Sequence, residues 1–393
     1  MRDVRCLGAA MLLGSIGMMG ELVVLGWLAL ELTDSPFLVG AAMGARALPL
    51  FFVGVPAGVL ADRVPRHRLL MATATAAALT SGALGALTLA GAVSLTLLVL
   101  LTLLSGVARA VEHAARQSYT HDVVGGAALV NAFAILGVAM RSGWLVGSLG
   151  AGVVIARWGS GAAYLAVSVA YLAGGAAYFW ASPGTRAMTA GTASLWQGIV
   201  DFLVVLRRDR LLLVLMLLTA GAEVLGFCHQ ALLPSIARDV LRAGPETLGV
   251  LNAARSVGGI LGLVASMGAT ARGSGMLFLA VLLSFGASVM LLGAAPYVVG
   301  LAGVVLVLVV VNAAGALADL LAQSLLQLSV PAELRGRAGG AWVVAIGLAP
   351  LGQLQIGALA SLFGVSAALG ASGAALVALT AAVAWWSPRA RKL

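Results

Sequence analysis

Ionisable residues inside long apolar runs are the part of this sequence that could do chemistry. A charge at the bilayer centre costs at least ~2.5–3.5 kcal/mol, so each such residue should face a charged partner or a wet cavity. A carboxyl group beside an arginine can change its protonation state when the arginine moves or a ligand enters. The candidates, which indicate proton or ion movement, are Glu21, Arg46, Arg109, Arg141, Glu223, His229, Arg255 and Asp319.

Two acidic residues are matched in depth by two arginines. Glu21 lies ten residues before Glu31 at the outer end of its apolar run, and Arg46 lies about as deep in the next run. At ~1.5 Å per residue both are ~15 Å deep, which is the middle of a ~30 Å hydrocarbon core. Glu223 and Arg255 repeat this arrangement later in the chain. We therefore predict two acid–base pairs.

The coupling proton is assigned to Glu21 or Glu223, with Asp319 as the third candidate. Asp319 follows Arg109 by 210 residues, so these two occupy equivalent places in the two halves of the chain. The alternative for each predicted pair is a purely structural ion pair that stays charged.

The composition requires the elements that carry these residues to span a membrane. The chain has 393 residues, of which 61% are hydrophobic and 9% charged, whereas soluble proteins carry roughly 25% charged residues. A water-soluble enzyme is excluded. We expect an all-α polytopic membrane protein with twelve spans, at about residues 7–31, 37–60, 69–90, 94–111, 129–155, 160–181, 211–235, 246–270, 275–295, 297–328, 339–361 and 363–386.

The distribution of basic residues predicts the topology. With an even number of spans, most of the 23 Lys and Arg residues fall on the cytoplasmic side, whereas Arg157, Arg238 and Arg242 fall outside. This bias places both termini in the cytoplasm of a multi-pass protein of the cell membrane. The formal net charge of +9 therefore reflects topology, and no nucleic-acid partner is expected.

An internal repeat divides the chain into two halves. The segment from Pro36 to Arg46 (PFLVGAAMGAR) is answered 209 residues later by PETLGVLNAAR, with Pro, Gly and Arg at identical spacing. Gly147, Gly152 and Gly159 recur 205 residues later as glycines. The repeat predicts an N-terminal six-helix bundle at 1–181, a cytoplasmic linker at 182–210 with an interfacial helix, and a C-terminal six-helix bundle at 211–393. Parallel halves of this kind hold substrate near the midplane.

The chain resembles the major facilitator superfamily over its whole length. The loop after the second span, GVLADRVPRHR from Gly58 to Arg68, resembles the family signature, with Pro65 where a Gly is usual. The stretch from Gln327 to Gly340, followed by Pro350-Leu-Gly, is similar to the twelve-helix proton-coupled efflux branch that includes enterobactin and macrolide exporters.

The resemblance implies a cytoplasmic gate and a proton-transfer helix. Asp62 would meet the N-terminus of the eleventh helix and hold the halves together on the cytoplasmic side; the gate motif comprises Gly58, Asp62, Arg63 and Arg66. Arg109 resembles the basic residue of a fourth-helix motif linked to proton transfer, although Glu112-His113 replace the usual Gln-Gly. The glycines between Gly143 and Gly152 look like the antiporter motif, and close helix packing explains them equally well.

A central cavity is expected to bind the substrate. Its arginines favour an anionic or polar amphiphilic compound over a cationic drug. Arg46, Arg141 and Arg255 are the charge partners; the other lining residues are Trp27, Trp144, Phe227, His229, Gln353 and Gln355. No metal or organic cofactor is expected: Glu112, His113, His121 and Asp122, which we place in a solvated loop, fit no zinc spacing.

The sequence as a whole predicts a monomeric secondary transporter in the lipid bilayer. It would export a small molecule, such as a drug, siderophore or amphiphilic metabolite, by proton-coupled alternating access. One alternative is a proton- or ion-coupled importer of a small polar or anionic metabolite. A second alternative is a membrane sensor or scaffold that transports nothing.

Overall fold

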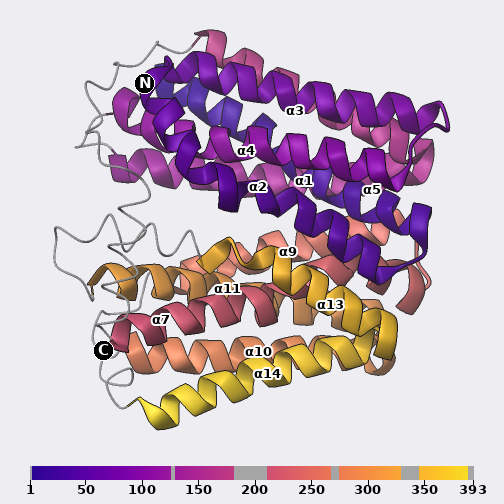
Figure 1. Ribbon diagram of the computed structural model, residues 1–393, viewed down its shortest axis with the longest axis vertical. Helices are drawn as coiled ribbons and strands as arrows, with labels where there is room; N and C mark the ends of the chain where they lie inside the picture. Colours follow the sequence, from indigo (N-terminus) through magenta and orange to yellow (C-terminus); the bar gives the residue numbers. More distant parts are fainter. Residues whose placement is uncertain (1, 125–128, 181–209, 267–273, 329–344, 388–393) are drawn as a thin grey trace. The chain divides into compact units, whose positions relative to one another are not determined.

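A computed structural model describes residues 2–124, 129–180, 210–266, 274–328 and 345–387 (Figure 1). The predicted linker up to residue 209 and the start of the eleventh span lie outside these residues. The described residues form helices joined by short turns, without strands. Helices satisfy their backbone hydrogen bonds internally, which is the condition for crossing a hydrocarbon layer.

The first half of the chain forms five helices and a short 3-10 turn. The fifth helix contains both the fifth and the sixth predicted spans, divided at Gly159, where the backbone leaves the helical conformation (φ 82°, ψ 170°). The elements are α1 (Arg2–Thr33), α2 (Pro36–Arg63), α3 (Arg66–Leu89), α4 (Leu95–Val124), α5 (Leu129–Ala177) and η2 (Tyr178–Trp180).

The second half begins with a helix of changing pitch. The seventh predicted span consists of α7 (Arg210–Gly221), the π-helical η3 (Ala222–Gly226), the 3-10 helix η4 (Phe227–Leu232), α8 (Leu233–Ser235) and the π-helical η5 (Ile236–Val240). The helices that follow are α9 (Pro245–Ser266), α10 (Ser274–Val298), α11 (Gly300–Leu328), α13 (Ala349–Phe363) and α14 (Val365–Trp386).

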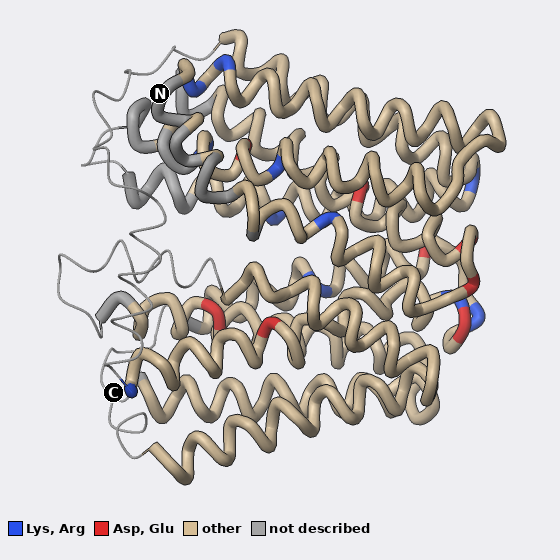
Figure 2. The backbone as a smooth tube through the Cα atoms, viewed as in Figure 1, with Lys and Arg blue, Asp and Glu red and all other residues tan. Residues whose placement is uncertain are grey.

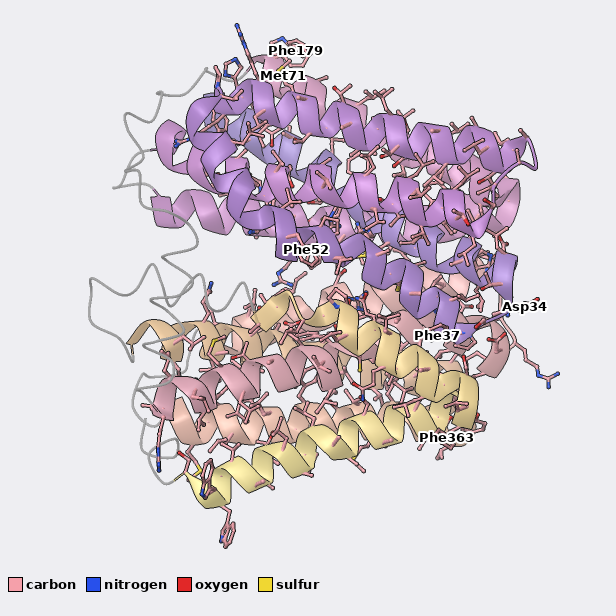
Figure 3. The ribbon with its side chains drawn as sticks, in the orientation of Figure 1. Asp34, Phe37, Phe52, Met71, Phe179 and Phe363 are labelled. Atoms are coloured by element: carbon pink, nitrogen blue, oxygen red, sulfur yellow. The ribbon has the colours of Figure 1, made fainter. Side chains whose placement is uncertain are left out.

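Apart from the fourth, described below, the helical segments agree closely with the predicted spans in the part of the chain that the structure describes. Nine described helices are long and apolar enough to cross a membrane, and α2 contributes the shorter apolar segment Pro36–Leu50. Charged residues are sparse along the helices (Figure 2). Large aromatic side chains such as Phe52, Phe179 and Phe363 are exposed (Figure 3), as a lipid-facing surface requires. The prediction of an all-helical polytopic membrane protein is confirmed.

The fourth helix is longer than expected. The sequence predicted a solvated loop after residue 111, but α4 continues to Val124. Arg116 Nη1 donates to Glu112 Oε1 at 2.8 Å, and an ion pair four residues apart stabilises a helix. This pair supports the helical conformation beyond the predicted end of the span.

The chain divides into two compact units. Unit 1 comprises Met1–Asp34, Ala45–Gly191 and Ala243–Ala253, and unit 2 comprises Ser35–Gly44, Thr192–Arg242 and Ala254–Leu393. Unit 1 is built around α1, α3, α4 and α5, with α5 packed on both α1 and α3; in unit 2, α10 packs on α11 and α14. The first residues of α2 are grouped with unit 2, and those of α9 with unit 1.

The repeated glycines make equivalent contacts in the two units. In unit 1, a side chain at Gly147 would collide with the backbone of Ile16, and one at Gly152 with the start of α9 at Pro245. In unit 2, a side chain at Gly352 would collide with the backbone of Val224. Gly357 is the counterpart of Gly152, and a side chain there would collide with the start of α2 at Pro36. The glycine repeat therefore marks places where helix backbones touch.

The repeat also extends to the turns. Gly364, which separates α13 from α14, has φ 86° and ψ 160°, nearly the conformation of Gly159. A positive φ of this kind is accessible to glycine and is strained for residues with a Cβ atom. Each half therefore reverses direction between its fifth and sixth helical segments at a glycine.

Candidate functional site

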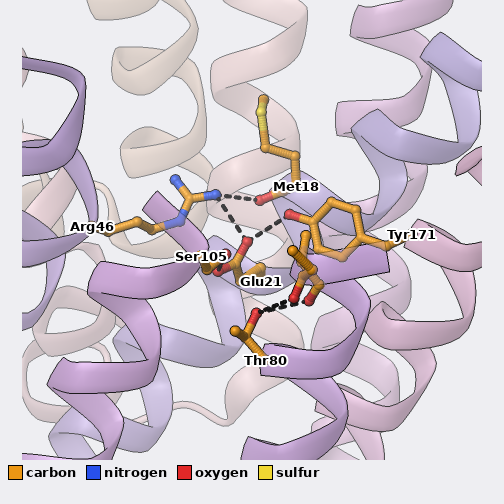
Figure 4. Close-up of polar contacts among 8 residues, drawn as sticks. Met18, Glu21, Arg46, Thr80, Ser105 and Tyr171 are labelled. Atoms are coloured by element: carbon orange, nitrogen blue, oxygen red, sulfur yellow. Dashed lines mark hydrogen bonds and ion pairs between the residues drawn. The ribbon is translucent and has the colours of Figure 1, made fainter. Parts of the chain in front are cut away.

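The carboxylate of Glu21 is the centre of a polar cluster inside unit 1 (Figure 4). It lies on α1, 2% exposed, and accepts hydrogen bonds from three different helices. Tyr171 Oη on α5 donates to Oε2 at 2.6 Å, and Ser105 Oγ on α4 donates to Oε1 at 2.7 Å. Arg46 Nη2 on α2 lies 3.4 Å from Oε2. The first acid–base pair predicted from the sequence is confirmed.

Close backbone packing brings α2 and α4 to this carboxylate. Gly106, next to Ser105, leaves no room for a side chain because a Cβ atom there would lie 2.7 Å from the backbone oxygen of Arg46. Arg46 Nη2 also donates to the backbone oxygen of Met18 at 3.0 Å. A small residue at a helix crossing therefore fixes the distance between the guanidinium and the acid.

A second arginine adds positive charge to the cluster. Arg109 on α4 interacts electrostatically with Glu21, Glu112 and Arg46. Its Nε and Nη1 atoms are buried and have no hydrogen-bond partner among the described residues. Unit 1 therefore surrounds Glu21 with two guanidiniums and two hydroxyl donors. Such donors favour the ionised carboxylate, because protonation would remove the charge to which they are oriented.

The second predicted pair is not formed. The electrostatic partner of Glu223 among the described residues is Asp319 on α11, another acid, while Arg255 on α9 lies near His229. The depth argument assumed a regular α-helix, but Glu223 lies in the π-helical η3 and His229 in the 3-10 helix η4. The changed pitch rotates these side chains relative to a regular helix. The prediction of a Glu223–Arg255 pair was therefore wrong.

Glu223 and Asp319 line one small cavity inside unit 2. The cavity has a volume of about 10 Å³, and Phe227 lies in its wall together with Thr219 and Phe278. Glu223 is 9% exposed, and Phe227 packs against Phe285 with 5.0 Å between ring centroids. Two acidic side chains thus share a largely apolar pocket of unit 2.

His229 is held by its own helix. Its Nδ1 atom is 2.7 Å from the backbone oxygen of Gly226, which satisfies that nitrogen. Its Nε2 atom is buried without a hydrogen-bond partner among the described residues. The side-chain oxygen Oε1 of Gln353 is likewise buried and unpaired there, whereas Gln355 is half-buried. These three predicted substrate residues belong to unit 2.

The predicted tryptophans belong to unit 1 and have partners of their own. Trp27 Nε1 donates to Glu31 Oε1 at 2.6 Å, and Ser160 Oγ donates to the other oxygen of that carboxylate at 2.8 Å. The guanidinium of Arg141 lies 5.8 Å from the ring centroid of Trp144, within the range of a cation–π contact. Their role in substrate binding remains a prediction.

The gate motif lies mostly outside the described side chains. The backbone places Gly58, Asp62 and Arg63 at the end of α2 and Arg66 at the start of α3. The side chains of Asp62 and Arg63, and the helix start near Gly339 that Asp62 was expected to meet, lie outside the described part of the structure. The gating role of Asp62 remains a prediction.

Sequence reasoning missed Tyr171 and Ser105, the two hydroxyl donors to Glu21. Each lies in an apolar run and is separated from Glu21 by 150 and 84 residues, respectively. Hydroxyl residues occur throughout the spans, so their type alone gave no signal. Finding them would have required knowing which helices pack against one another.

Replacing Tyr171 by Phe tests the bond to the carboxylate. The variant keeps the ring and removes one donor to a buried charge, so we expect it to lower the free energy of unfolding by about 1.5–3 kcal/mol. Thermal melting of the detergent-purified protein measures the change. Tyr164→Phe is the matched control, because the Tyr164 hydroxyl is buried without a hydrogen-bond partner in the described part of the chain. Equal melting temperatures for the two variants would contradict the assignment.

Three solved structures of transporters are similar to this chain. The nucleoside transporter NupG aligns with a TM-score of 0.80 at 13% identity, over 97% of this chain and 99% of that chain. A peptide transporter POT aligns with 0.79 at 14% identity, over 99% and 94%. A bacterial homologue of the human lysosomal transporter Spinster aligns with 0.77 at 14% identity, over 98% of both chains. At these identities the likeness shows the fold alone.

The sequence profile of one family covers nearly the whole chain. The family is described as "Transmembrane secretion effector", and its profile matches residues 2–390. No curated protein matches the sequence. The profile and the fold agree with the resemblance carried by the loop after the second helix. The chain therefore belongs to the transmembrane secretion effector family and is a transporter of the major facilitator superfamily, not an enzyme.

Proposed function

We propose that this transporter exports a small molecule from the cytoplasm in exchange for protons, and that Glu223 and Asp319 carry the proton. The direction follows the family description, which is one of secretion. The observation that supports the coupling role is the placement of Glu223: it is nine-tenths buried, lines an apolar pocket and interacts with Asp319. The cargo is a drug, siderophore or amphiphilic metabolite.

Like charges in a shared pocket favour binding of a proton. Two ionised carboxylates close together in a low-dielectric site repel each other, and a proton on either one removes that repulsion. Because the two groups interact, we assign the proton to the pair rather than to either residue. Half-buried Asp319 would give this pair access to protons, whereas Glu223 is nearly closed off.

The cluster around Glu21 is assigned a different task. Three hydrogen-bond donors and the charge of Arg109 surround this carboxylate. Protonation of Glu21 would leave two guanidiniums in unit 1 facing a neutral acid, which is costly in a buried site. We infer that Glu21 stays ionised through the cycle, where it ties α1, α2, α4 and α5 together. Arg109 then acts as a charge partner and not as a proton carrier.

Coupling follows from the charge of the acid pair. Proton binding neutralises a carboxylate, and this lowers the cost of enclosing the pair away from water. Proton release restores the charge and favours the conformation in which the pair is hydrated. If proton and cargo bind in different conformations, each shifts the same equilibrium in opposite directions, as alternating access requires.

The proposed setting is the cell membrane, with both termini in the cytoplasm and with a monomer as the working unit. The basic residues near the chain ends and in the loop at 63–68 support this orientation. The gate motif would close the cytoplasmic side during the cycle. The domain bounds 1–181, 182–210 and 211–393 are proposed for the two bundles and their linker.

Inside-out membrane vesicles test export and coupling together. A respiratory substrate acidifies the vesicle interior, and a pH-sensitive dye reports the gradient. Adding a catecholate siderophore or a macrolide should collapse part of the gradient in vesicles that contain the protein, because each cargo molecule entering the vesicle releases protons. Vesicles without the protein are the control. If cargo enters and the gradient is unaffected, proton coupling is wrong.

The alternative is import of a small polar or anionic metabolite. Arginines in the helices favour this class of compound. In the same vesicles, an importer coupled to protons would move cargo out of the lumen together with protons. If cargo preloaded in the lumen is lost when the vesicles are energised, import replaces export as the proposed direction of transport.

A further inference from the structure

A second cavity lies inside unit 1, away from the acid pair. It has a volume of about 50 Å³ and lies between α1, α3, α4 and the last part of α5. Its wall contains Arg109, Glu112, Arg116 and Tyr171. The remaining lining is mostly apolar and is formed largely by glycine, alanine, leucine and methionine. The proposed transport cycle makes no use of this space.

Small residues make the cavity. Gly14 on α1 lines it, and a Cβ atom built on Gly14 would meet nothing within 4 Å. Gly174 and Gly175 of α5 also line it, together with Ala74 of α3. A water molecule needs roughly 10–15 Å³ of such space. The cavity therefore has room for several water molecules or for one larger monatomic ion.

The charges around the cavity do not balance. Arg46 pairs with Glu21 and Arg116 pairs with Glu112, at 3.4 and 2.8 Å. Arg109 is a third guanidinium for these two carboxylates, so the five groups carry one excess positive charge. Its Nε and Nη1 atoms are buried and have no acceptor among the described residues. Buried donors that lack an acceptor are costly, and an anion in the cavity would accept from them and balance the excess charge.

We propose that the cavity beside Arg109 binds a monovalent, halide-sized anion. The cavity volume admits one such ion. The lining favours a halide over an oxyanion, because a spherical ion needs fewer directed donors than the several oxygens of sulfate or a carboxylate, and the wall is mostly apolar apart from its charged groups and the hydroxyls of Ser15, Thr73, Tyr171 and Tyr178. The Tyr171 hydroxyl already donates to Glu21, whereas the Nε and Nη1 groups of Arg109 are the charged donors of the wall that lack a partner among the described residues. Desolvation is least costly for the larger halides, so affinity should rise from chloride to bromide to iodide. The bound ion would stabilise the packing of α1, α4 and α5.

Thermal melting of the purified full-length protein tests the site. Sodium gluconate is replaced stepwise by sodium chloride, bromide or iodide at constant ionic strength. We expect a saturable rise of a few degrees in melting temperature in the stated halide order. Arg109→Gln should abolish the rise, and Arg141→Gln, which removes an arginine outside the cavity wall, should retain it. No transport is measured, so the result does not depend on the proposed export.

Gly14→Val provides a second variant in case Arg109→Gln does not fold. It fills open space and leaves every charge in place, so the protein should fold and lose its halide response. Anomalous diffraction from crystals grown in bromide should show a peak between Arg109 and Gly14. A melting temperature that is the same in gluconate and halide would overturn the proposal. So would an equal halide response in Gly14→Val and the parent protein.

Discussion

Replacing Glu223 by Gln is expected to abolish proton-driven export while leaving downhill movement of cargo intact. Gln keeps the shape of the side chain and cannot exchange a proton, so the Glu223–Asp319 pair loses its switch. We expect accumulation of cargo in inside-out vesicles to fall at least about tenfold, which corresponds to about 1.4 kcal/mol of lost driving force. Counterflow between equal pH values should continue, because it needs no net proton movement.

The matched control is Glu246→Gln, which neutralises an exposed acid at the start of α9. This variant should accumulate cargo like the parent protein. Asp319→Asn should behave like Glu223→Gln, since the proton belongs to the pair. A Glu223→Gln variant that still collapses the pH gradient on addition of cargo would contradict the assignment. If Glu21→Gln loses cargo accumulation while Glu223→Gln keeps it, the proton carrier lies in unit 1.

Replacing Gly147 by Leu should be among the most damaging single changes in unit 1. A side chain at this position would run into the backbone of Ile16 on α1, so α1 and α5 would have to separate. Contacts between backbones cannot be relieved by a change of rotamer, and we expect a loss of about 3 kcal/mol or more in the free energy of unfolding. Fluorescence-detected size-exclusion chromatography of the expressed protein measures the folded yield.

Gly150→Leu is the control for this prediction. Gly150 lies on the same helix, one turn further along, and a Cβ atom there meets nothing within 4 Å. The added side chain should therefore face open space, and the folded yield should stay near that of the parent protein. If both variants fold equally well, or if Gly150→Leu is the worse of the two, the backbone contact at Gly147 does not stabilise the unit.

The sequence predicted the structure reliably where the free-energy cost of placing a residue in lipid limits where that residue can lie. Long apolar runs located the helices, because a spanning segment has to be apolar and helical. The repeated glycines indicated the two related halves, and the structure places helix crossings at Gly147 and Gly352 and turns at Gly159 and Gly364. The loop after the second helix pointed to the family. These features depend on the local sequence and on its repeat.

Partner choice depended on information that the local sequence lacks. Depth arithmetic paired Glu21 with Arg46 correctly, since α1 and α2 are regular there. The same arithmetic failed for Glu223, which lies in the π-helical η3 and has Asp319 as its electrostatic partner among the described residues.

The apolar runs and their repeat by themselves determined that this chain is a helical membrane protein made of two related halves. Only the tertiary structure decided that Tyr171 and Ser105 satisfy Glu21, that Glu223 faces another acid and that a cavity lies beside Arg109. The reason is that a side chain's contacts depend on the rotation of its helix and on the packing of distant helices. Both are set by the whole molecule, while hydrophobicity is a property of each segment alone.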